Sequence, residues 1–124
     1  MDQPVRIVIA DDQPRACQGL QALLTTWPEI EIVGKAANGQ EAVRLVEQCR
    51  PDVVLMDIRM PVMDGLEATH LIKARWPQVR IVALTMYATY RTDALAAGAD
   101  AFLLKGCPVN DLLNAVEETR RRKC

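Results

Sequence analysis

Short strand-like runs alternate along the chain with longer stretches in which apolar residues recur at helical spacing. The runs are Val5–Ala10, Glu31–Ala36, Val53–Met56, Arg80–Leu84 and Ala101–Leu104. Their content of β-branched and other apolar residues is typical of strands. The third and fourth runs show no alternation of apolar and polar positions, as expected for parallel strands that helices cover on both faces. The pattern therefore predicts five strands in a buried sheet.

The stretches between the runs predict five helices. They are Pro14–Trp27, a helix that Asn38 opens and that ends before Pro51, Gly65–Arg75, Ala88–Ala97, and a helix from Val109 into the basic cluster 120–123. Asn38 and Glu41 have the spacing of a capping box, in which each side chain binds a free backbone N–H at the helix start. Gly98 is expected to end the fourth helix.

Strands that alternate with helices favour parallel pairing through right-handed crossovers. The fold class expected is therefore α/β, a three-layer, doubly wound, five-stranded parallel sheet. With 124 residues, the chain has the length of one domain, 1–124.

Composition excludes several classes of function. Half of the residues are hydrophobic, and the net charge of −1 gives no field that would attract nucleic acid or an anionic membrane. The apolar run near the N-terminus is too short for a signal peptide or a membrane span, so a soluble, cytoplasmic protein is expected. Four cysteines without a C-x-x-C pair, and a single histidine, His70, argue against a zinc site.

Polar residues gather where the predicted strands end. Asp11 and Asp12 follow the first strand, Asp57 the third, Thr85 the fourth and Lys105 the fifth. Because the carboxyl ends of parallel strands share one edge of the sheet, these side chains are expected to converge there. Two like charges ~4 Å apart cost roughly 4 kcal/mol at an effective dielectric near 20. Three carboxylates therefore need a cation or a proton among them, and oxygen ligands without His or Cys favour Mg²⁺.

The same constellation suits phosphoryl chemistry. A carboxylate, Mg²⁺, the ammonium of Lys105 and the hydroxyl of Thr85 around one point match the charge and acceptor oxygens of a phosphoryl group. Asp57 ends an apolar strand that would hold its carboxylate at the floor of the pocket, as a nucleophile requires. Pro61 and Gly65 would shape the loop that leaves the pocket.

These residues identify a family. With Asp11-Asp12, the string DIRMPVMDG at 57–65, Thr85 and Lys105, the whole chain resembles the receiver domain of bacterial two-component response regulators. The resemblance implies a flavodoxin-like sheet of order 2-1-3-4-5. It also implies that Asp57 takes a phosphoryl group from a phosphohistidine of a sensor histidine kinase, and that the chain is otherwise no enzyme beyond this phosphotransfer and a slow autodephosphorylation.

Further site roles follow from the resemblance alone. Asp11, Asp12, Asp57 and the backbone carbonyl of Arg59 would hold Mg²⁺, while Lys105 and Thr85 would contact the acyl phosphate. Thr85 and Phe102 would form the conformational switch.

The stretch LTMYATYRTDALAAGADAFLLKG, from 84 to 106, resembles the subclass that carries a C-terminal helix-turn-helix domain. A DNA-binding role would belong to that domain, which is absent here, and phosphorylation would promote a homodimer. Two positions depart from the family's pattern. Lys105 precedes Gly106 where the family often has Lys-Pro with a cis peptide, and Phe102 stands where a tyrosine is common.

Two other functions fit parts of the pattern. A phosphohydrolase that works through an aspartyl phosphate would place a second acid two residues after the nucleophile, but this chain has Arg59 there. A flavodoxin-like cofactor binder would need a glycine-rich phosphate loop after the first strand, where Asp11-Asp12 would repel a phosphate. Arg59 and Tyr87 either rim the pocket and limit water access or have a structural role alone, and His70 is interpreted as a surface or rim residue rather than a phosphate carrier.

Overall fold

The computed structural model describes residues 3–123, and for residues 120–123 only the helical backbone. Its five strands are β1 (Val5–Ala10), β2 (Ile30–Ala36), β3 (Val53–Met56), β4 (Arg80–Thr85) and β5 (Ala101–Leu104). All four neighbouring pairs are parallel, and the strand order is β2-β1-β3-β4-β5. The predicted fold class and strand order are confirmed.

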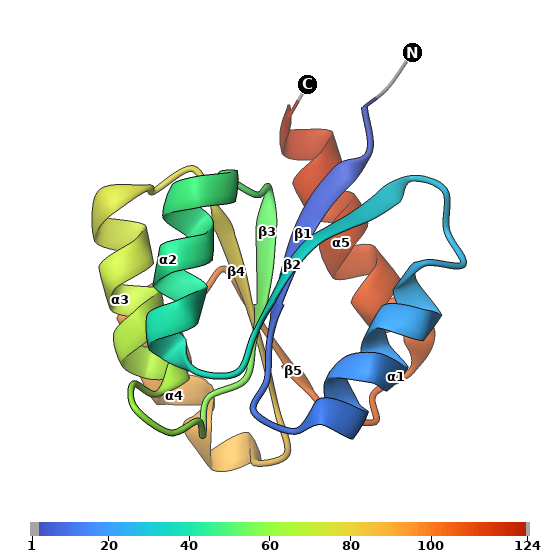
Figure 1. The fold of residues 1–124 in the computed structure, drawn as a ribbon. Helices are drawn as coiled ribbons and strands as arrows, with labels where there is room; N and C mark the ends of the chain where they lie inside the picture. The colour runs from blue at the N-terminus through green and yellow to red at the C-terminus, as the bar shows by residue number, and fades with distance from the viewer. Residues whose placement is uncertain (1–2, 124) are drawn as a thin grey trace.

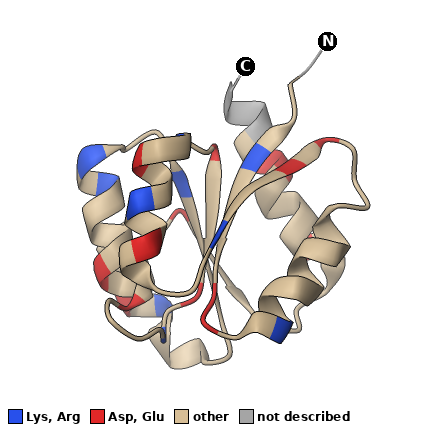
Figure 2. Ribbon diagram, viewed as in Figure 1, with Lys and Arg blue, Asp and Glu red and all other residues tan. Residues whose placement is uncertain are grey.

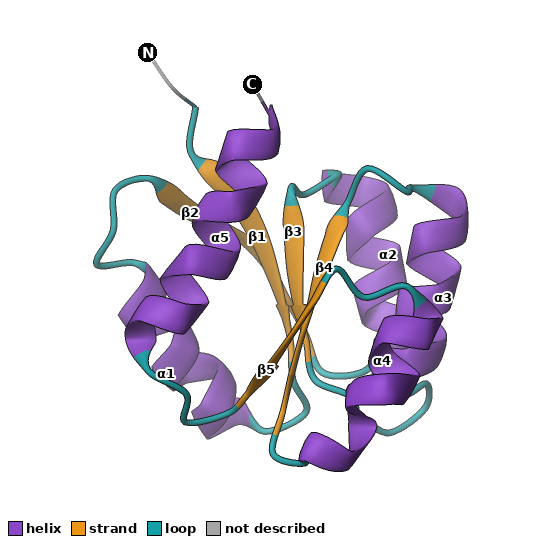
Figure 3. Cartoon of the chain, turned by 180° about the vertical axis from the view of Figure 1, so that it is seen from behind, coloured by secondary structure: helices purple, strands orange, loops and turns teal. Residues whose placement is uncertain are grey.

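Helices cover the sheet on both faces. They are α1 (Pro14–Leu24), α2 (Gly39–Cys49), α3 (Gly65–Arg75), α4 (Arg91–Ala97) and α5 (Val109–Lys123). Helices α1 and α5 lie on one face, and α2, α3 and α4 lie on the other, as the two opposite views show (Figure 1, Figure 3). The result is the expected three-layer sandwich. No helix within residues 3–123 is long and apolar enough to cross a membrane.

The sheet separates two apolar clusters. Along β1, Val5, Ile7 and Ile9 point into the cluster under α1 and α5, whereas Val8 and Ala10 point into the cluster under α2 and α3. Side chains alternate between the faces of a strand, so a strand covered on both faces must be apolar at every position. This requirement explains why the central strands lack polar alternation.

Helix α1 is shorter than predicted, because it ends at Leu24 instead of Trp27. The hydroxyls of Thr25 and Thr26 donate to the carbonyl oxygens of Ala22 (3.2 Å) and Leu23 (2.7 Å). Such side-chain bonds to carbonyls of the preceding turn compete with continuation of the helix. Trp27 nevertheless packs against the cluster under α1 and α5, which is why it fitted the helical apolar pattern.

The predicted helix termini are largely confirmed. The Asn38 side chain accepts a bond from Glu41 N at 2.8 Å, and Gly98 ends α4 at a φ of 111°. The segment predicted as one helix over Ala88–Ala97 divides into a 3₁₀ turn, Ala88–Tyr90, and α4.

The two edges of the sheet differ in chemistry. The carboxyl ends of the strands meet at the edge drawn lowest in Figure 1, whereas β1 begins and α5 ends at the opposite edge. Figure 2 shows acidic residues where the central strands end at the lower edge. The fold thus brings the predicted polar positions to a single edge.

Candidate functional site

Asp57 is fixed by the backbone of its neighbours. Its amide donates to the carbonyl of Ala10 at 2.9 Å, which extends the pairing of β3 with β1 by one residue. Its Oδ1 accepts a hydrogen bond from Ile58 N at 2.7 Å, and only 7% of the residue is exposed. The second oxygen, Oδ2, faces the ammonium of Lys105. The carboxylate is therefore held in one orientation by a rigid strand end.

Two more acids lie beside Asp57. Asp11 continues β1 through a bond from its amide to the carbonyl of Ala36 (2.9 Å), and its Oδ1 accepts a bond from Gln13 N (2.8 Å). One carboxylate oxygen each from Asp11, Asp12 and Asp57 lie within 4.8 Å of one another. Asp11 is buried and Asp12 is half-buried. The predicted convergence of the three acids is confirmed.

Lys105 bridges two of these acids. Its Nζ lies 2.7 Å from Asp11 Oδ2 and 2.9 Å from Asp57 Oδ2. Its backbone is fixed because Lys105 N donates to the carbonyl of Thr85 at 2.7 Å. The peptide bond to Gly106 is trans, as are the other described peptide bonds, and Gly106 has a φ of 86°. A left-handed glycine therefore turns the chain here, where the family often uses a proline.

Burial affects the two charges in opposite ways. Burial is the largest influence on Asp57 and raises its pKa, the negative charge of Asp11 raises it further, and the hydrogen bond and charge of Lys105 offset only part of the rise. Burial alone would lower the pKa of Lys105, but its hydrogen bonds to Asp11 and Asp57 raise it. The ammonium therefore stays charged, while ionised Asp57 lacks full compensation.

This imbalance predicts how stability depends on pH without a metal. Because the pKa of Asp57 is higher in the folded protein than its value of 3.8 in the unfolded chain, folding favours the protonated carboxyl. This contribution to stability is fully present below pH 3.8 and is lost as the pH rises through the pKa of Asp57 in the folded protein. Asp57→Asn cannot ionise, so we expect it to be more stable than the parent at neutral pH. Its advantage should vanish towards pH 3.8 and below. Urea unfolding in EDTA across a pH series measures the difference, and an advantage that grows as the pH falls would refute the assignment.

The predicted switch residues lie close to the site but are not in contact with its charges. Thr85 ends β4 and is 1% exposed, and its Oγ1 accepts a long bond, 3.4 Å, from Tyr87 N. Within residues 3–119, no hydrogen bond joins this hydroxyl to Asp57 or to the Lys105 ammonium. Phe102 is half-buried against Ala83 and Ala94, and the Arg91 guanidinium lies 5.8 Å from its ring centroid.

A groove beside the acids is formed by the loop after β3. Asp12, Arg59 and Pro61 line it, and the Arg59 guanidinium lies 5.5 Å from the ring centroid of Tyr87. Arg59 thus lies in one groove with Asp12, and Tyr87 is placed by its contact with Arg59. His70 is exposed on α3.

Sequence reasoning missed two backbone features of this loop. Gly65 N donates to the carbonyl of Ile58 at 2.7 Å, and a Cβ at Gly65 would overlap the backbone of Asp57. Val62 has a φ of 69° and is 77% exposed. A β-branched residue is rare in this left-handed conformation, so no sequence signal announces it. Gly65 was predicted to shape this loop, but its close approach to the backbone of Asp57 was not predicted.

The fold and the site together define the class: a flavodoxin-like α/β domain with an acidic pocket at the carboxyl edge of its sheet. The chain belongs to the response regulator receiver domain family, whose model matches residues 7–117. The resemblance identified from the sequence is therefore confirmed.

Individual relatives extend this finding. The transcriptional regulatory protein LnrK of Bacillus subtilis is 40% identical over 114 residues, which are 90% of this chain and 52% of LnrK. The chain spans about half the length of the curated relatives it matches. A LuxR-family DNA-binding response regulator from Staphylococcus aureus is 28% identical with a TM-score of 0.86, covering 94% of this chain and 98% of that one.

A third relative was solved with ions present. It belongs to the CheX-CheY-BeF₃-Mg²⁺ complex of Borrelia burgdorferi and is 27% identical, with a TM-score of 0.85. The match covers 94% of this chain and 89% of that one. Among the residues that the structure describes in the present chain, Asp11, Asp12 and Asp57 form a group of acids that could hold a metal ion.

Proposed function

We propose that the chain is a cytoplasmic phosphorylation switch in which Asp57 accepts a phosphoryl group from a sensor histidine kinase. The observation that carries this proposal is the Asp57 carboxylate, which is buried, fixed by Ile58 N and adjacent to two acids and one lysine. Oδ2 would attack the phosphorus, the phosphohistidine nitrogen would leave, and Lys105 would neutralise the transferred oxygens. The domain would occupy residues 1–124, of which 1–2 and 124 lie outside the described residues.

Magnesium is part of this proposal. Asp11, Asp12, Asp57 and the carbonyl of Arg59 would supply oxygen ligands, and waters would complete the octahedron. Hard oxygen donors and the net negative charge of the three acids fit this ion. When bound, Mg²⁺ would offset the charge that accumulates as the phosphoryl group approaches a cluster of carboxylates. The BeF₃ and Mg²⁺ named for the Borrelia complex are consistent with the same chemistry in a similar fold.

A phosphohydrolase is the weaker alternative. The residue two positions after Asp57 is Arg59, whose guanidinium lies over the Tyr87 ring. Arginine is protonated at all ordinary pH values and cannot act as a general base for water. The site therefore favours a long-lived acyl phosphate over rapid turnover.

Labelling tests the function directly. With acetyl phosphate and Mg²⁺, we expect one phosphoryl group per chain, and EDTA should block the reaction because the acids then repel the donor. Asp57→Asn should remove the label, whereas the control Asp93→Asn, an exposed acid on α4, should keep it. Phosphate chemistry that persists in Asp57→Asn, or a label on His70, would contradict the proposal.

The conformational output is a further part of the proposal. Within the described residues the Thr85 hydroxyl has only a long bond to Tyr87 N, so little holds it away from new acceptor oxygens on Asp57. Its shift would open space that Phe102, on the neighbouring strand, can enter. This movement would promote a homodimer and, through an output domain of a longer protein, act on transcription.

Thr85→Ala isolates this step. Reversing a 1:99 population needs about 5.5 kcal/mol of differential interaction. Charge-assisted hydrogen bonds contribute roughly 1.5–3 kcal/mol each, so loss of the Thr85 bond should lower the active fraction from about 99% to roughly 40–90%. We expect beryllofluoride with Mg²⁺ to increase the sedimenting mass of Thr85→Ala less than that of the parent, although Thr85→Ala should still take the acetyl phosphate label. Equal masses in every sample would refute the dimer, and an unchanged Phe102 NMR environment in the activated parent would refute the coupling.

A further inference from the structure

Helix α4 is attached to the sheet by little apolar surface. Ala94 is its buried residue, and it packs in a small cluster with Ile58 and Ala83. Leu95, the largest apolar side chain of the helix, is 44% exposed. Burial of an alanine side chain removes much less apolar area from water than burial of a leucine does. Contacts of other kinds therefore have a large share in fixing the position of α4 on the sheet.

One such contact joins α4 to the predicted switch residue on β5. The guanidinium of Arg91, the first residue of α4, lies 5.8 Å from the ring centroid of Phe102. Arg91 is exposed and forms no ion pair or side-chain hydrogen bond within residues 3–119. The Phe102 ring is therefore the described partner of this charge, and a cation over an aromatic face is attracted to the ring.

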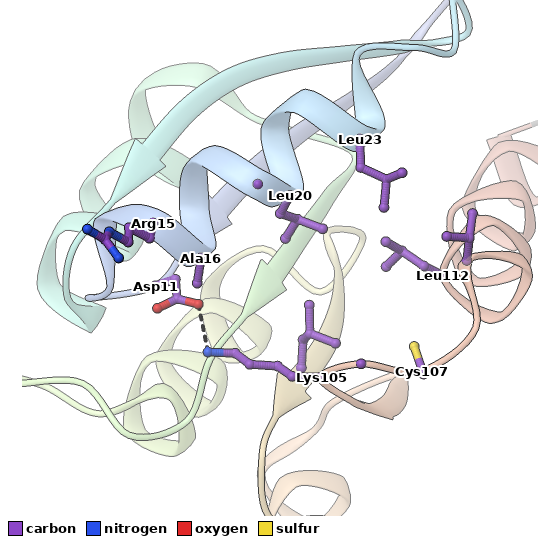
Figure 4. Close-up of a pocket in the computed structure, with 12 residues that line it drawn as sticks. Asp11, Arg15, Ala16, Leu20, Leu23, Lys105, Cys107 and Leu112 are labelled. Carbon is purple, nitrogen blue, oxygen red and sulfur yellow. Dashed lines mark ion pairs between the residues drawn. The ribbon is translucent and has the colours of Figure 1, made fainter.

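The other cation near the switch already has partners. Lys105 follows β5, the strand of Phe102, and its side chain extends towards Asp11, with which Figure 4 shows its ion pair. The same ammonium also pairs with Asp57. Lys105 therefore neutralises the acids, whereas Arg91 contacts the ring.

The register of the sheet places the ring on the same face as Thr85. Phe102 pairs with Ala83, and Leu104 pairs with Thr85, in parallel strands. Because positions two apart on a strand share a face, Phe102 and Thr85 both lie on the face that α4 covers. Movement of the ring into space beside Thr85 would take it inwards and away from the exposed Arg91. The guanidinium would not follow, because an unpaired charge is costly to bury.

We propose that the Arg91–Phe102 contact is autoinhibitory: it holds the ring half-buried and opposes the rearrangement that a phosphoryl group on Asp57 would drive. This role rests on the proposed function. In a two-state switch, a contact made only in the resting state lowers the fraction of molecules in the active state. The apparent affinity for a phosphoryl group or its mimic falls by the same factor. Removal of the guanidinium should therefore make activation easier, although it removes a contact from the fold.

The contact itself is tested without any ion. Phe102 is the only phenylalanine of the chain, so 4-fluorophenylalanine incorporated in its place gives a single ¹⁹F resonance. We expect Arg91→Gln to displace this resonance, because the charge over the ring is gone. Arg44→Gln, which removes the same charge from an exposed position of α2, is the matched control and should leave the resonance where it is.

Titration with beryllofluoride at a fixed Mg²⁺ concentration, followed by calorimetry, tests the autoinhibition. We expect Arg91→Gln to bind beryllofluoride about two- to fivefold more tightly than the parent, as loss of an exposed cation–π contact implies. Electrostatics alone predicts the opposite sign, since loss of a cation weakens the binding of an anion. Arg44→Gln should therefore bind no more tightly than the parent.

A double-mutant cycle assigns the effect to the ring. Phe102→Leu keeps an apolar side chain but removes the aromatic face. In that background Arg91→Gln should no longer tighten beryllofluoride binding, because the two side chains act as a pair. Circular dichroism verifies that each variant is folded.

Three results would overturn the autoinhibition. They are an unmoved ¹⁹F resonance in Arg91→Gln, equal or weaker beryllofluoride binding by that variant, and an undiminished gain in the Phe102→Leu background. Failure of the proposed function gives a different result. A parent that binds no beryllofluoride with Mg²⁺ would refute the switch and the autoinhibition together, whereas a parent that binds it without tighter binding by Arg91→Gln would refute the autoinhibition alone.

Discussion

Lys105→Met should destabilise the protein by about 3–5 kcal/mol in EDTA, because it leaves two buried carboxylates without their shared cation. The ammonium lies within 2.9 Å of an oxygen of each acid, and 19% of its side chain is exposed. Methionine keeps most of the apolar stem, so the loss reports mainly the charge. Urea unfolding of the parent and the variant gives the difference.

Magnesium should restore part of this loss. With the ammonium absent, the acids repel one another more strongly, and binding of a divalent cation to the folded state alone stabilises it by mass action. We therefore expect Mg²⁺ to raise the unfolding free energy of Lys105→Met more than that of the parent. Arg44→Met, at an exposed cation of α2, is the control and should respond as the parent does. Equal Mg²⁺ responses in all three proteins would contradict a metal site at these acids.

Gly65→Ala should cost about 3 kcal/mol or more and damage the site at the same time. A Cβ at this position would overlap the Asp57 carbonyl oxygen and come within 2.8 Å of Ile58 Cα. Both obstacles are backbone atoms of the segment that carries the nucleophile, so relief of the clash would move Asp57.

Gly19→Ala is the matched control for this change. Its Cβ meets nothing within 4 Å, and alanine favours a helix interior over glycine by roughly 0.5–1 kcal/mol. We expect opposite signs: Gly65→Ala unfolds at lower urea and labels poorly with acetyl phosphate, and Gly19→Ala unfolds at higher urea and labels normally. A Gly65→Ala protein of parental stability would show that this backbone approach is not required.

Sequence periodicity was sufficient for the fold class because burial dictates which positions are apolar. The unbroken apolar runs of β3 and β4 predicted a sheet covered on both faces. The alternation of strands with helices predicted parallel strands, and hence the edge of the sheet at which the acids meet. Strand order came instead from the family resemblance, since periodicity does not say which strands are neighbours. The predicted end of α1 was wrong because Trp27 continues the apolar pattern of the helix. The helix ends earlier, at Leu24, where the hydroxyls of Thr25 and Thr26 bind carbonyl oxygens of the preceding turn.

The sequence predicted which residues meet in the site, but not which of their atoms are in contact. Asp11, Asp12, Asp57 and Lys105 could be placed together from strand ends alone. That Lys105 bridges two of the acids depends on side-chain conformations that no sequence pattern encodes. The left-handed Val62 and the open space beside Gly19 arise from tertiary packing, and propensity alone would place a different residue at each position.

The chemical identity of the acceptor is the central claim, and mapping the phosphoryl group tests it most directly. Acyl phosphates are reduced by borohydride, which converts a phosphorylated aspartate to homoserine. After labelling with acetyl phosphate and Mg²⁺, reduction and proteolysis, mass spectrometry should find homoserine at position 57 and unmodified aspartate at positions 11 and 12. Homoserine at Asp11 or Asp12, or a phosphoryl group retained on His70 with Asp57 unmodified, would contradict the account.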